Sequence, residues 1–189
     1  MTLPFEFVGG APALDFVNTV SWGERDQERF NSFDDVVDWA MKAGVIKRRE
    51  RGGARELRDV LKIRDMLHRV FIARANDAKP AAKDLNAFNS ELAEIVLSVQ
   101  WGAAALARAR RRGAGAPLGI RDEVLWNAAQ ILTSDALIRT CANVTCGWVF
   151  IDTSRRGNRR WCDMAHCGAR DKALRYYNRI SGKAAGKRR

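Results

Sequence analysis

The chain has 189 residues, of which 47% are hydrophobic, and its 33 basic and 22 acidic side chains give a net charge of +11. No apolar run approaches the roughly 20 residues that a membrane helix needs, and the N-terminus lacks the basic start and apolar core of a signal peptide. We therefore expect a soluble, cytoplasmic protein without a membrane partner. Thiols stay reduced in that compartment, so clustered cysteines favour metal binding or catalysis over disulfides.

The positive charge is concentrated at the C-terminal end. Residues 139–189 contain 13 basic and three acidic side chains, a net charge of +10. The other 138 residues contain 20 basic and 19 acidic side chains, a net charge of only +1. A near-neutral body followed by a basic end indicates a polyanionic partner, with nucleic acid as the first candidate.

The chain is expected to open with a β-hairpin. Two extended candidates, residues 5–8 and 14–20, flank the turn-rich residues 9–12. Asp15 and Asn18 interrupt the second candidate. These two side chains could form a small-molecule pocket that makes the body a sensor, or they could satisfy backbone groups at the end of a hairpin or helix. The second interpretation is favoured, because Asp and Asn often bond to nearby backbone.

Helices are predicted for most of the remaining body. Ser32 and Asp35 form an expected capping box at the start of the first helix. Apolar residues at helical spacing predict further helices at about 54–76, from Pro80 to about 96, and at about 122–138. The polar, turn-rich stretch 107–117 is expected to be a mobile loop.

All four cysteines lie close together, with the spacing Cys141-x4-Cys146-x15-Cys162-x4-Cys167. Two close pairs separated by 15 residues are typical of a structural zinc site, because each pair can supply one edge of a tetrahedron around Zn²⁺. Two disulfides, or four buried thiols without a ligand, are the alternatives. His166 is a substitute ligand to consider. A shell closed by four thiolates leaves no open position for catalysis, so we expect no enzyme.

The segments around the cysteines complete a small module. Residues 148–151 and 159–161 are strand candidates on either side of a turn, and a helix is expected over 168–180, with an apolar face that can pack on the hairpin. The predicted fold class is therefore α+β. It comprises a mainly α-helical body with a short N-terminal β-hairpin, over residues 1–138, and a C-terminal treble-clef-like four-cysteine zinc finger, over residues 139–181.

Two motifs suggest a known family. RRWCDMAHCGARDKALRYYNR, residues 159–179, resembles the CGNR-type zinc finger, in which RRWC, a short spacer, CGNR and a basic helix follow one another. LDFVNT, residues 14–19, resembles the hallmark of ABATE, the helical domain usually fused to that finger. The two motifs bracket nearly the whole chain, and the resemblance implies bacterial transcription regulators linked to stress. Ala169 stands where the family has Asn, so it can neither cap a backbone group nor touch a phosphate through a side chain.

The cations of the finger form the candidate nucleic-acid surface. The side chains expected to contact nucleic acid are Arg155, Arg156, Arg159, Arg160, Arg170, Lys172, Arg175 and Arg179. Three of them repeat along one face of the expected helix. Residues 182–189 are expected to be a disordered basic tail. Only the family resemblance favours DNA over RNA.

These patterns predict a DNA-binding transcription regulator whose body senses a small-molecule signal or forms a homodimer. A protein-interaction adaptor, with the zinc finger as a rigid scaffold, is the second hypothesis. A small-molecule-binding enzyme with a pocket near Asp15 and Asn18 is the third. It is the weakest, because no paired carboxylates, nucleophile–base pair or open metal site can be identified.

Overall fold

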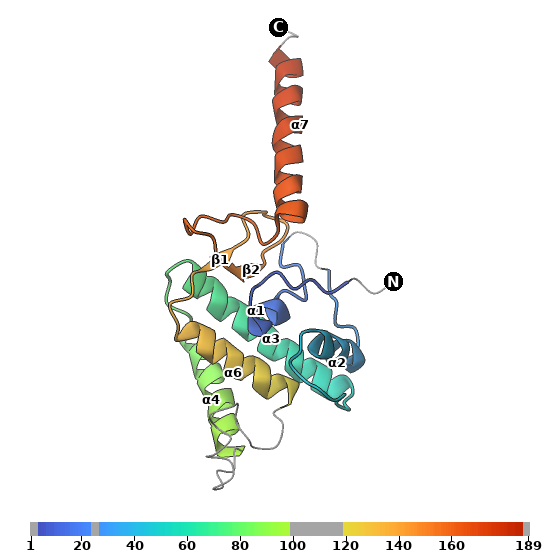
Figure 1. The fold of residues 1–189 in the computed structure, drawn as a ribbon, viewed down its shortest axis with the longest axis vertical. Helices are drawn as coiled ribbons and strands as arrows, with labels where there is room; N and C mark the ends of the chain where they lie inside the picture. Colours follow the sequence, from blue (N-terminus) through green and yellow to red (C-terminus); the bar gives the residue numbers. More distant parts are fainter. Residues whose placement is uncertain (1–3, 24–26, 99–118, 187–189) are drawn as a thin grey trace.

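The computed structural model describes residues 4–23, 27–98 and 119–186, and it shows a helical body followed by a small β-hairpin and a long helix (Figure 1). The body helices are α1 (Pro12–Val17), α2 (Phe33–Lys42), α3 (Ala54–Ala75), α4 (Ala82–Ser98) and α6 (Ile120–Leu132). The C-terminal elements are β1 (Ile138–Thr140), β2 (Val149–Ile151), the π-helical turn η1 (Met164–Gly168) and α7 (Ala169–Gly186). The expected loop at 107–117 lies outside the described residues.

Helix α3 is the axis of the body. It contacts α1, α2, α4 and α6, and both strands of the hairpin also pack on it. The helix starts where the Glu56 carboxylate accepts a hydrogen bond from the Gly53 N–H at 2.8 Å. Its apolar stripe, which includes Val60, Leu67 and Phe71, is buried against the other helices. In Figure 1, α2 lies near the start of α3 and the β-hairpin near its end.

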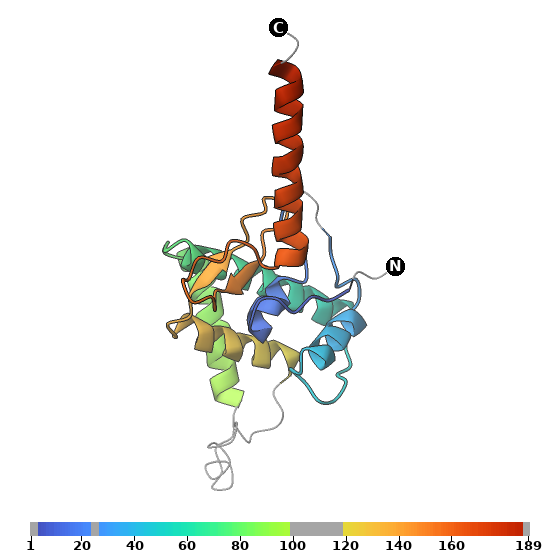
Figure 2. The same cartoon turned by 45° about the horizontal axis from the view of Figure 1, so that its top comes forward.

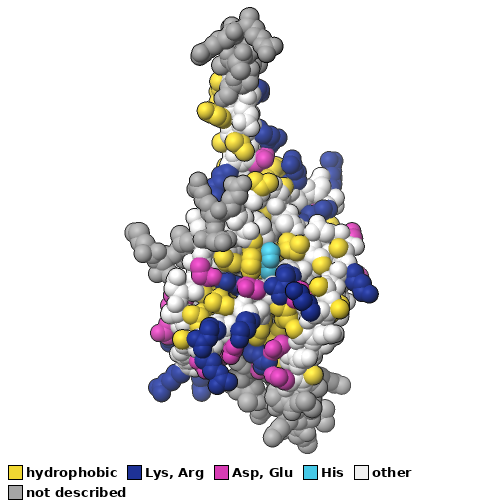
Figure 3. Space-filling view, turned by 180° about the vertical axis from the view of Figure 1, so that it is seen from behind, with side chains coloured by type: hydrophobic (Ala, Val, Ile, Leu, Met, Phe, Trp, Pro, Cys, Tyr) yellow, Lys and Arg dark blue, Asp and Glu magenta, His cyan; other side chains and the backbone are white. Residues whose placement is uncertain are grey.

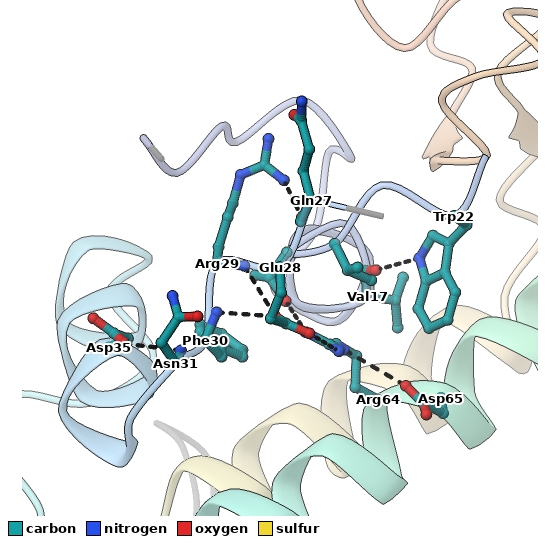
Figure 4. A network of polar contacts seen from close by, with 12 residues as sticks. Val17, Trp22, Gln27, Glu28, Arg29, Phe30, Asn31, Asp35, Arg64 and Asp65 are labelled. Carbon is teal, nitrogen blue, oxygen red and sulfur yellow. Dashed lines mark hydrogen bonds and ion pairs between the residues drawn. The ribbon is translucent and has the colours of Figure 1, made fainter. Parts of the chain in front are cut away.

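One charged side chain interrupts the apolar stripe of α3. Arg64 is only 4% exposed, and its Nη1 and Nη2 atoms each donate to a carboxylate oxygen of Glu28 at 2.6 Å (Figure 4). The same carboxylate accepts hydrogen bonds from the backbone N–H groups of Arg29 and Phe30 at 2.9 Å. Burial raises the pKa of Glu28, but these hydrogen bonds outweigh it and hold the pKa below its usual value. The pair ties residues 27–30 to the central helix.

The expected N-terminal β-hairpin is wrong. Residues 12–17 form helix α1, with Pro12 in the first turn and the Ala11 carbonyl accepting hydrogen bonds from that turn. Residues 4–8 have no regular secondary structure. A short apolar run that is buried on every side shows no clear periodicity, so the sequence did not separate a strand from a buried helix.

The hairpin of the finger also pairs differently from the expectation. Strand β2 pairs antiparallel with β1, with Thr140 opposite Val149, and not with residues 159–161. The first cysteine pair therefore lies in the turn of this hairpin, and the Cys141 N–H extends the ladder by donating to the Trp148 carbonyl at 2.8 Å. The chain then returns through an irregular segment. A hairpin with this knuckle, followed by a helix that begins near the second cysteine pair, confirms the treble-clef-like arrangement.

Helix α7 projects away from the rest of the molecule (Figures 1 and 2). It continues to Gly186, so residues 182–186 are helical rather than the expected disordered tail, and residues 187–189 lie outside the described part. Ala184 and Ala185 favour this continuation, since alanine is the best helix former. The expected packing of the helix on the hairpin is wrong, because Tyr177 is 68% and Ile180 49% exposed.

Candidate metal centre and nucleic-acid interface

The four cysteine sulfurs converge on one point. Their Sγ atoms all lie within 4.8 Å of one another, and the distances from Cys162 to Cys146 and to Cys167 are both 3.7 Å. A tetrahedron of sulfurs about 2.3 Å from a zinc ion has edges of about 3.8 Å. All four side chains are buried free thiols, and sulfurs this far apart are not joined as disulfides. The cluster therefore has the donor set and spacing to bind one metal ion.

The first cysteine pair is held by backbone geometry and by the body. The Cys146 N–H donates to the Asn143 carbonyl at 2.9 Å, which closes the knuckle. Gly147 follows with a φ of +68°, and a Cβ atom built there would lie 2.7 Å from the Cβ of Trp22. Both the left-handed conformation and the close approach of the body require glycine at this position.

The second pair is organised by an aspartate. Asp163 precedes η1, and its Oδ1 atom accepts a hydrogen bond from the His166 backbone N–H at 2.8 Å. This cap positions Cys167 inside the π-helical turn. The His166 side chain is exposed, and its Nδ1 atom lies 3.0 Å from Asp163 rather than among the sulfurs. His166 is therefore not placed as a ligand.

The thiols influence one another strongly. Hydrogen bonds from the other thiols hold the pKa of Cys141 far below its usual value. The same contacts raise the pKa of Cys146 and of Cys162, and burial adds to the increase. Four thiolates this close together repel one another, so a cation is needed to hold all four in the deprotonated form.

Arg159 faces the finger's own backbone. Its Nε atom donates to the Trp161 carbonyl at 2.9 Å and its Nη2 atom donates to the Cys162 carbonyl. The guanidinium lies over the Phe150 ring, 4.5 Å from the centroid. This arginine, expected to contact nucleic acid, therefore orients the second knuckle.

Asp152 is a structural residue that the sequence analysis did not identify. Its side chain is fully buried and accepts hydrogen bonds from Ser154, from the Arg159 backbone N–H and from Arg139 Nε. Burial raises the pKa of Asp152, but these hydrogen bonds lower it to about 2. The Asp-x-Ser sequence is a signature of an Asx turn and could have pointed to this role.

The other candidate cations lie outward. The exposed members of the set are Arg155, Arg156, Arg160, Arg170, Lys172, Arg175 and Arg179. Arg175 forms an ion pair with Asp171 at 2.8 Å, and Arg179 lies over the Tyr176 ring. Within the described ranges, none of the exposed set except Arg175 has a carboxylate at ion-pair distance. Figure 3 shows Lys and Arg side chains along one side of the projecting helix and hydrophobic side chains along the other.

Asp15 and Asn18 do not form the pocket considered for them. The Asp15 carboxylate accepts a hydrogen bond from the Gly9 N–H at 2.7 Å, and burial raises its pKa to about 6. Asn18 is 2% exposed and bonds both backbone groups of Val149, donating to the carbonyl at 2.8 Å and accepting from the N–H at 3.0 Å. Both side chains thus satisfy buried backbone, and Asn18 joins the body to strand β2.

Contacts of Trp148, Trp22 and His68 strengthen this junction. The Trp148 Nε1 atom donates to the Val20 carbonyl at 2.8 Å, and the backbone N–H of Trp22 donates to the Cys146 carbonyl at 3.0 Å. His68 stacks on Trp22, and its Nε2 atom lies 3.0 Å from the Gly147 carbonyl. Burial lowers the pKa of His68 to about 4, so the ring is neutral and Nε2 carries the proton that it donates. No sequence spacing links residues so far apart, so this contact could not be predicted.

The comparisons agree with this architecture. Residues 10–135 match the family model ABATE, described as "Putative stress-induced transcription regulator", and residues 138–180 match the CGNR zinc finger. Families of these two types are in general not enzymes. No curated protein matches the chain. Across the residues that the structure describes, no helix is both long and apolar enough to cross a membrane. The first model covers more than half of the residues, so the chain belongs to the ABATE family and carries a CGNR zinc finger at its C-terminal end.

Proposed function

We propose that the protein is a zinc-dependent, DNA-binding transcription regulator. The finger contacts DNA through its outward cations, and the body holds the finger and receives a small-molecule signal or forms a homodimer. The observation that carries this proposal is the set of exposed, largely unpaired cations on a module organised around four converging thiols.

Helix α7 has the dimensions of a DNA-reading element. Its 18 residues correspond to about 27 Å of helix, and the major groove of DNA admits an α-helix. Lys172, Arg175 and Arg179 follow three- and four-residue spacing, which places them on one face. Phosphates along the groove edges attract such a row of cations.

The body offers a contrast within the same molecule. Several of its arginines are paired with carboxylates, as in Arg49 with Asp38 at 2.5 Å and Arg69 with Asp84 at 2.7 Å. Pairs of this kind neutralise the surface of the body. The outward cations of the finger have few such partners, so their field extends into solvent and favours a polyanion.

Zinc is the metal that this donor set favours. Four thiolates in a tetrahedron suit Zn²⁺, which has no redox chemistry and no geometric demand of its own. A shell closed by four thiolates leaves no position for water or substrate. We therefore assign the metal a structural role.

Fluorescence anisotropy with the zinc-loaded chain and duplex DNA tests the proposal. The variant K172Q/R175Q/R179Q should bind about tenfold more weakly, and the slope of log affinity against log salt should become less negative by about three. The matched control R48Q/R51Q/R58Q removes three exposed charges from the body and should change affinity less than about twofold. A parallel titration with single-stranded RNA compares the two nucleic acids.

Two results would overturn DNA binding. One is the lack of any salt-dependent binding by the zinc-loaded wild type. The other is an equal loss of affinity in the α7 variant and in the body control, because that would reflect net charge rather than a surface. Tighter binding of RNA than of duplex DNA would indicate that RNA, not DNA, is the ligand of the finger.

The apolar face of α7 supports the adaptor as a second candidate. Leu174, Tyr177 and Ile180 are 59%, 68% and 49% exposed, and an isolated helix of this length is marginal in water without a partner. A second copy of the chain would be the simplest partner. Sedimentation velocity of the wild type and of L174S/I180S tests this, since a dimer held by this face should dissociate in the variant.

A further inference from the structure

An exposed apolar side chain lies at the end of α7 that joins the finger. Met164 begins the π-helical turn η1, which runs directly into α7, and it is 63% exposed. Asp163, the preceding residue, caps this turn by accepting a hydrogen bond from the His166 N–H at 2.8 Å. The backbone that carries Met164 is therefore held in place, while the side chain is open to solvent.

Met164 shares a face with the cations of α7. A Cβ atom built on Gly168 would lie 3.0 Å from the Sδ atom of Met164 and 3.3 Å from its Cε atom, so the methionine lies over Gly168. Gly168 is four residues before Lys172 and seven before Arg175, and these spacings place the three residues on one face of the helix. Met164 therefore continues the row of Lys172, Arg175 and Arg179 toward the finger.

The returning segment adds a further cation near Met164. The Cδ2 atom of Trp161 lies 3.7 Å from the same Cβ position, and the Arg160 guanidinium lies over the Trp161 ring, 4.9 Å from the centroid. Arg160 and Lys172 are exposed, and neither has a carboxylate at ion-pair distance among the described residues. An apolar side chain in these surroundings fits a partner that presents an apolar group between anions.

The major groove of duplex DNA has this combination of groups. Phosphates lie along the edges of the groove, where cations can reach them. Thymine presents its C5 methyl group in the groove, and apolar contact with this methyl is one of the ways in which proteins recognise thymine. The flexible thioether of methionine adapts well to an irregular apolar surface.

We propose that Met164 contacts a thymine methyl group in the major groove and gives the finger a preference for thymine. The inference rests on the proposed DNA binding and deepens it, because phosphate contacts carry no sequence information, whereas Met164 contacts a base. It also gives a physical reason for DNA over RNA. RNA carries uracil, which lacks this methyl group, and side chains cannot read its deep, narrow major groove.

Two duplexes that differ only in the thymine methyl groups test the proposal. Fluorescence anisotropy of the zinc-loaded full chain compares an alternating A–T duplex with the same duplex in which deoxyuridine replaces thymidine. Every base pair of the first duplex contains a thymine, so the register of binding does not matter. Burial of one methyl group corresponds to about a threefold to fourfold gain in affinity. The wild type should prefer the thymine duplex by that factor.

Three variants assign the preference to one side chain. Met164→Gln keeps every cation but removes the apolar contact, so its preference should fall below about 1.5-fold, while the slope of log affinity against log salt stays at the wild-type value. Met164→Leu keeps an apolar side chain and should retain a preference of at least about twofold. The matched control Met41→Gln changes a methionine that is 39% exposed on α2 and should leave the preference unchanged.

Equal binding of the two duplexes by the wild type would overturn the proposal. A full wild-type preference in Met164→Gln would also overturn it, because the preference would then come from the shape of the DNA or from other residues. An equal loss in Met41→Gln would have the same meaning. Met164 and Met41 are both exposed, so the variants should fold, and far-UV circular dichroism checks this.

The same titrations separate this inference from the proposed function. If neither duplex binds in a salt-dependent way, DNA binding and the role of Met164 both fail. If both duplexes bind in a salt-dependent way but with equal affinity, the proposed function stands and only the thymine contact is rejected.

Discussion

Polar side chains have different roles in two regions of the molecule. One region is the junction between the body and the finger, and the other is the projecting helix α7. At the junction, Asn18 and His68 bond backbone groups of the finger. On α7, Lys172 and Arg179 are exposed and have no carboxylate partner among the described residues. The junction therefore uses its polar side chains to join the two parts, whereas these cations of the helix remain exposed to solvent.

The arginines of the finger divide in the same way. Arg139 and Arg159 bond carbonyls or a buried carboxylate inside the finger, whereas Arg155 and Arg156 are exposed in the turn. A count of charged residues does not distinguish these four arginines. The structure separates cations that hold the fold from cations that can meet a polyanion, and variants can test that separation.

Removal of the metal should have the largest effect. Apparent binding free energies for structural zinc are about 10–16 kcal/mol, so a chelator should unfold the finger. Ile138 and Val149 belong to the main hydrophobic core, so the body should also unfold at a lower denaturant concentration. Denaturation followed by far-UV circular dichroism, with chelator or with zinc, measures both effects. A body midpoint that chelation leaves unchanged would show that the junction contributes no stability.

Asn18→Leu should be the most damaging single substitution at the junction. It leaves the buried N–H and carbonyl of Val149 without partners, at a cost of about 4 kcal/mol in the free energy of unfolding. Urea denaturation measures this cost. The control Asn76→Ala removes an exposed amide that donates to its own helix and should cost less than about 1 kcal/mol. Equal losses in the two variants would contradict the role assigned to Asn18.

Asp15→Asn should stabilise the protein in a pH-dependent way. The folded pKa of about 6 lies above the unfolded value of about 4, so the folded state holds the proton more tightly. The stability of the wild type therefore falls as the pH rises from about 4 to 6. The neutral amide avoids this loss and should gain up to about 3 kcal/mol at pH 8.

Urea denaturation of the wild type and Asp15→Asn at pH 8 and at pH 4 measures this difference. Comparison at each pH cancels the pH dependence of metal binding, because both proteins carry the same cysteines. The gain should shrink to below about 1 kcal/mol near pH 4, where the wild-type carboxyl is protonated in the folded state and about half protonated in the unfolded state. A gain of the same size at both pH values would rule out titration of Asp15 as its cause.

The smallest effect should come from two adjacent arginines that face opposite ways. Arg159→Gln should cost about 2 kcal/mol, because it removes charged hydrogen bonds to two carbonyls. Arg160→Gln should cost less than about 1 kcal/mol, because it loses only an exposed contact with an aromatic ring. Thermal unfolding of the zinc-loaded variants compares them. A larger loss of stability in Arg160→Gln than in Arg159→Gln would contradict the assignment of Arg159 as inward-facing and Arg160 as outward-facing.

Local patterns were enough to predict part of this structure. The cysteine spacing predicted the cluster, since each pair needs only a tight turn to present two sulfurs. The capping box of Ser32 and Asp35 is present at the start of α2. These features depend on residues that are close in sequence.

Features that depend on distant contacts could not be predicted. The pattern predicted residues 159–161 as the partner of residues 148–151 and did not predict β1, which is the observed partner. The inward turn of Arg159 depends on where the Trp161 carbonyl lies. The contact between Asn18 and Val149 joins segments that are far apart in the chain. Each of these requires the tertiary fold, which composition and periodicity do not supply.

The most direct test of the account is a cobalt(II) titration of the reduced, metal-free chain, followed by visible absorption. We expect one equivalent to bind with the spectrum of a tetrahedral tetrathiolate site, and zinc to displace it. No binding, or a spectrum that requires fewer than four sulfur ligands, would contradict a finger organised around Cys141, Cys146, Cys162 and Cys167.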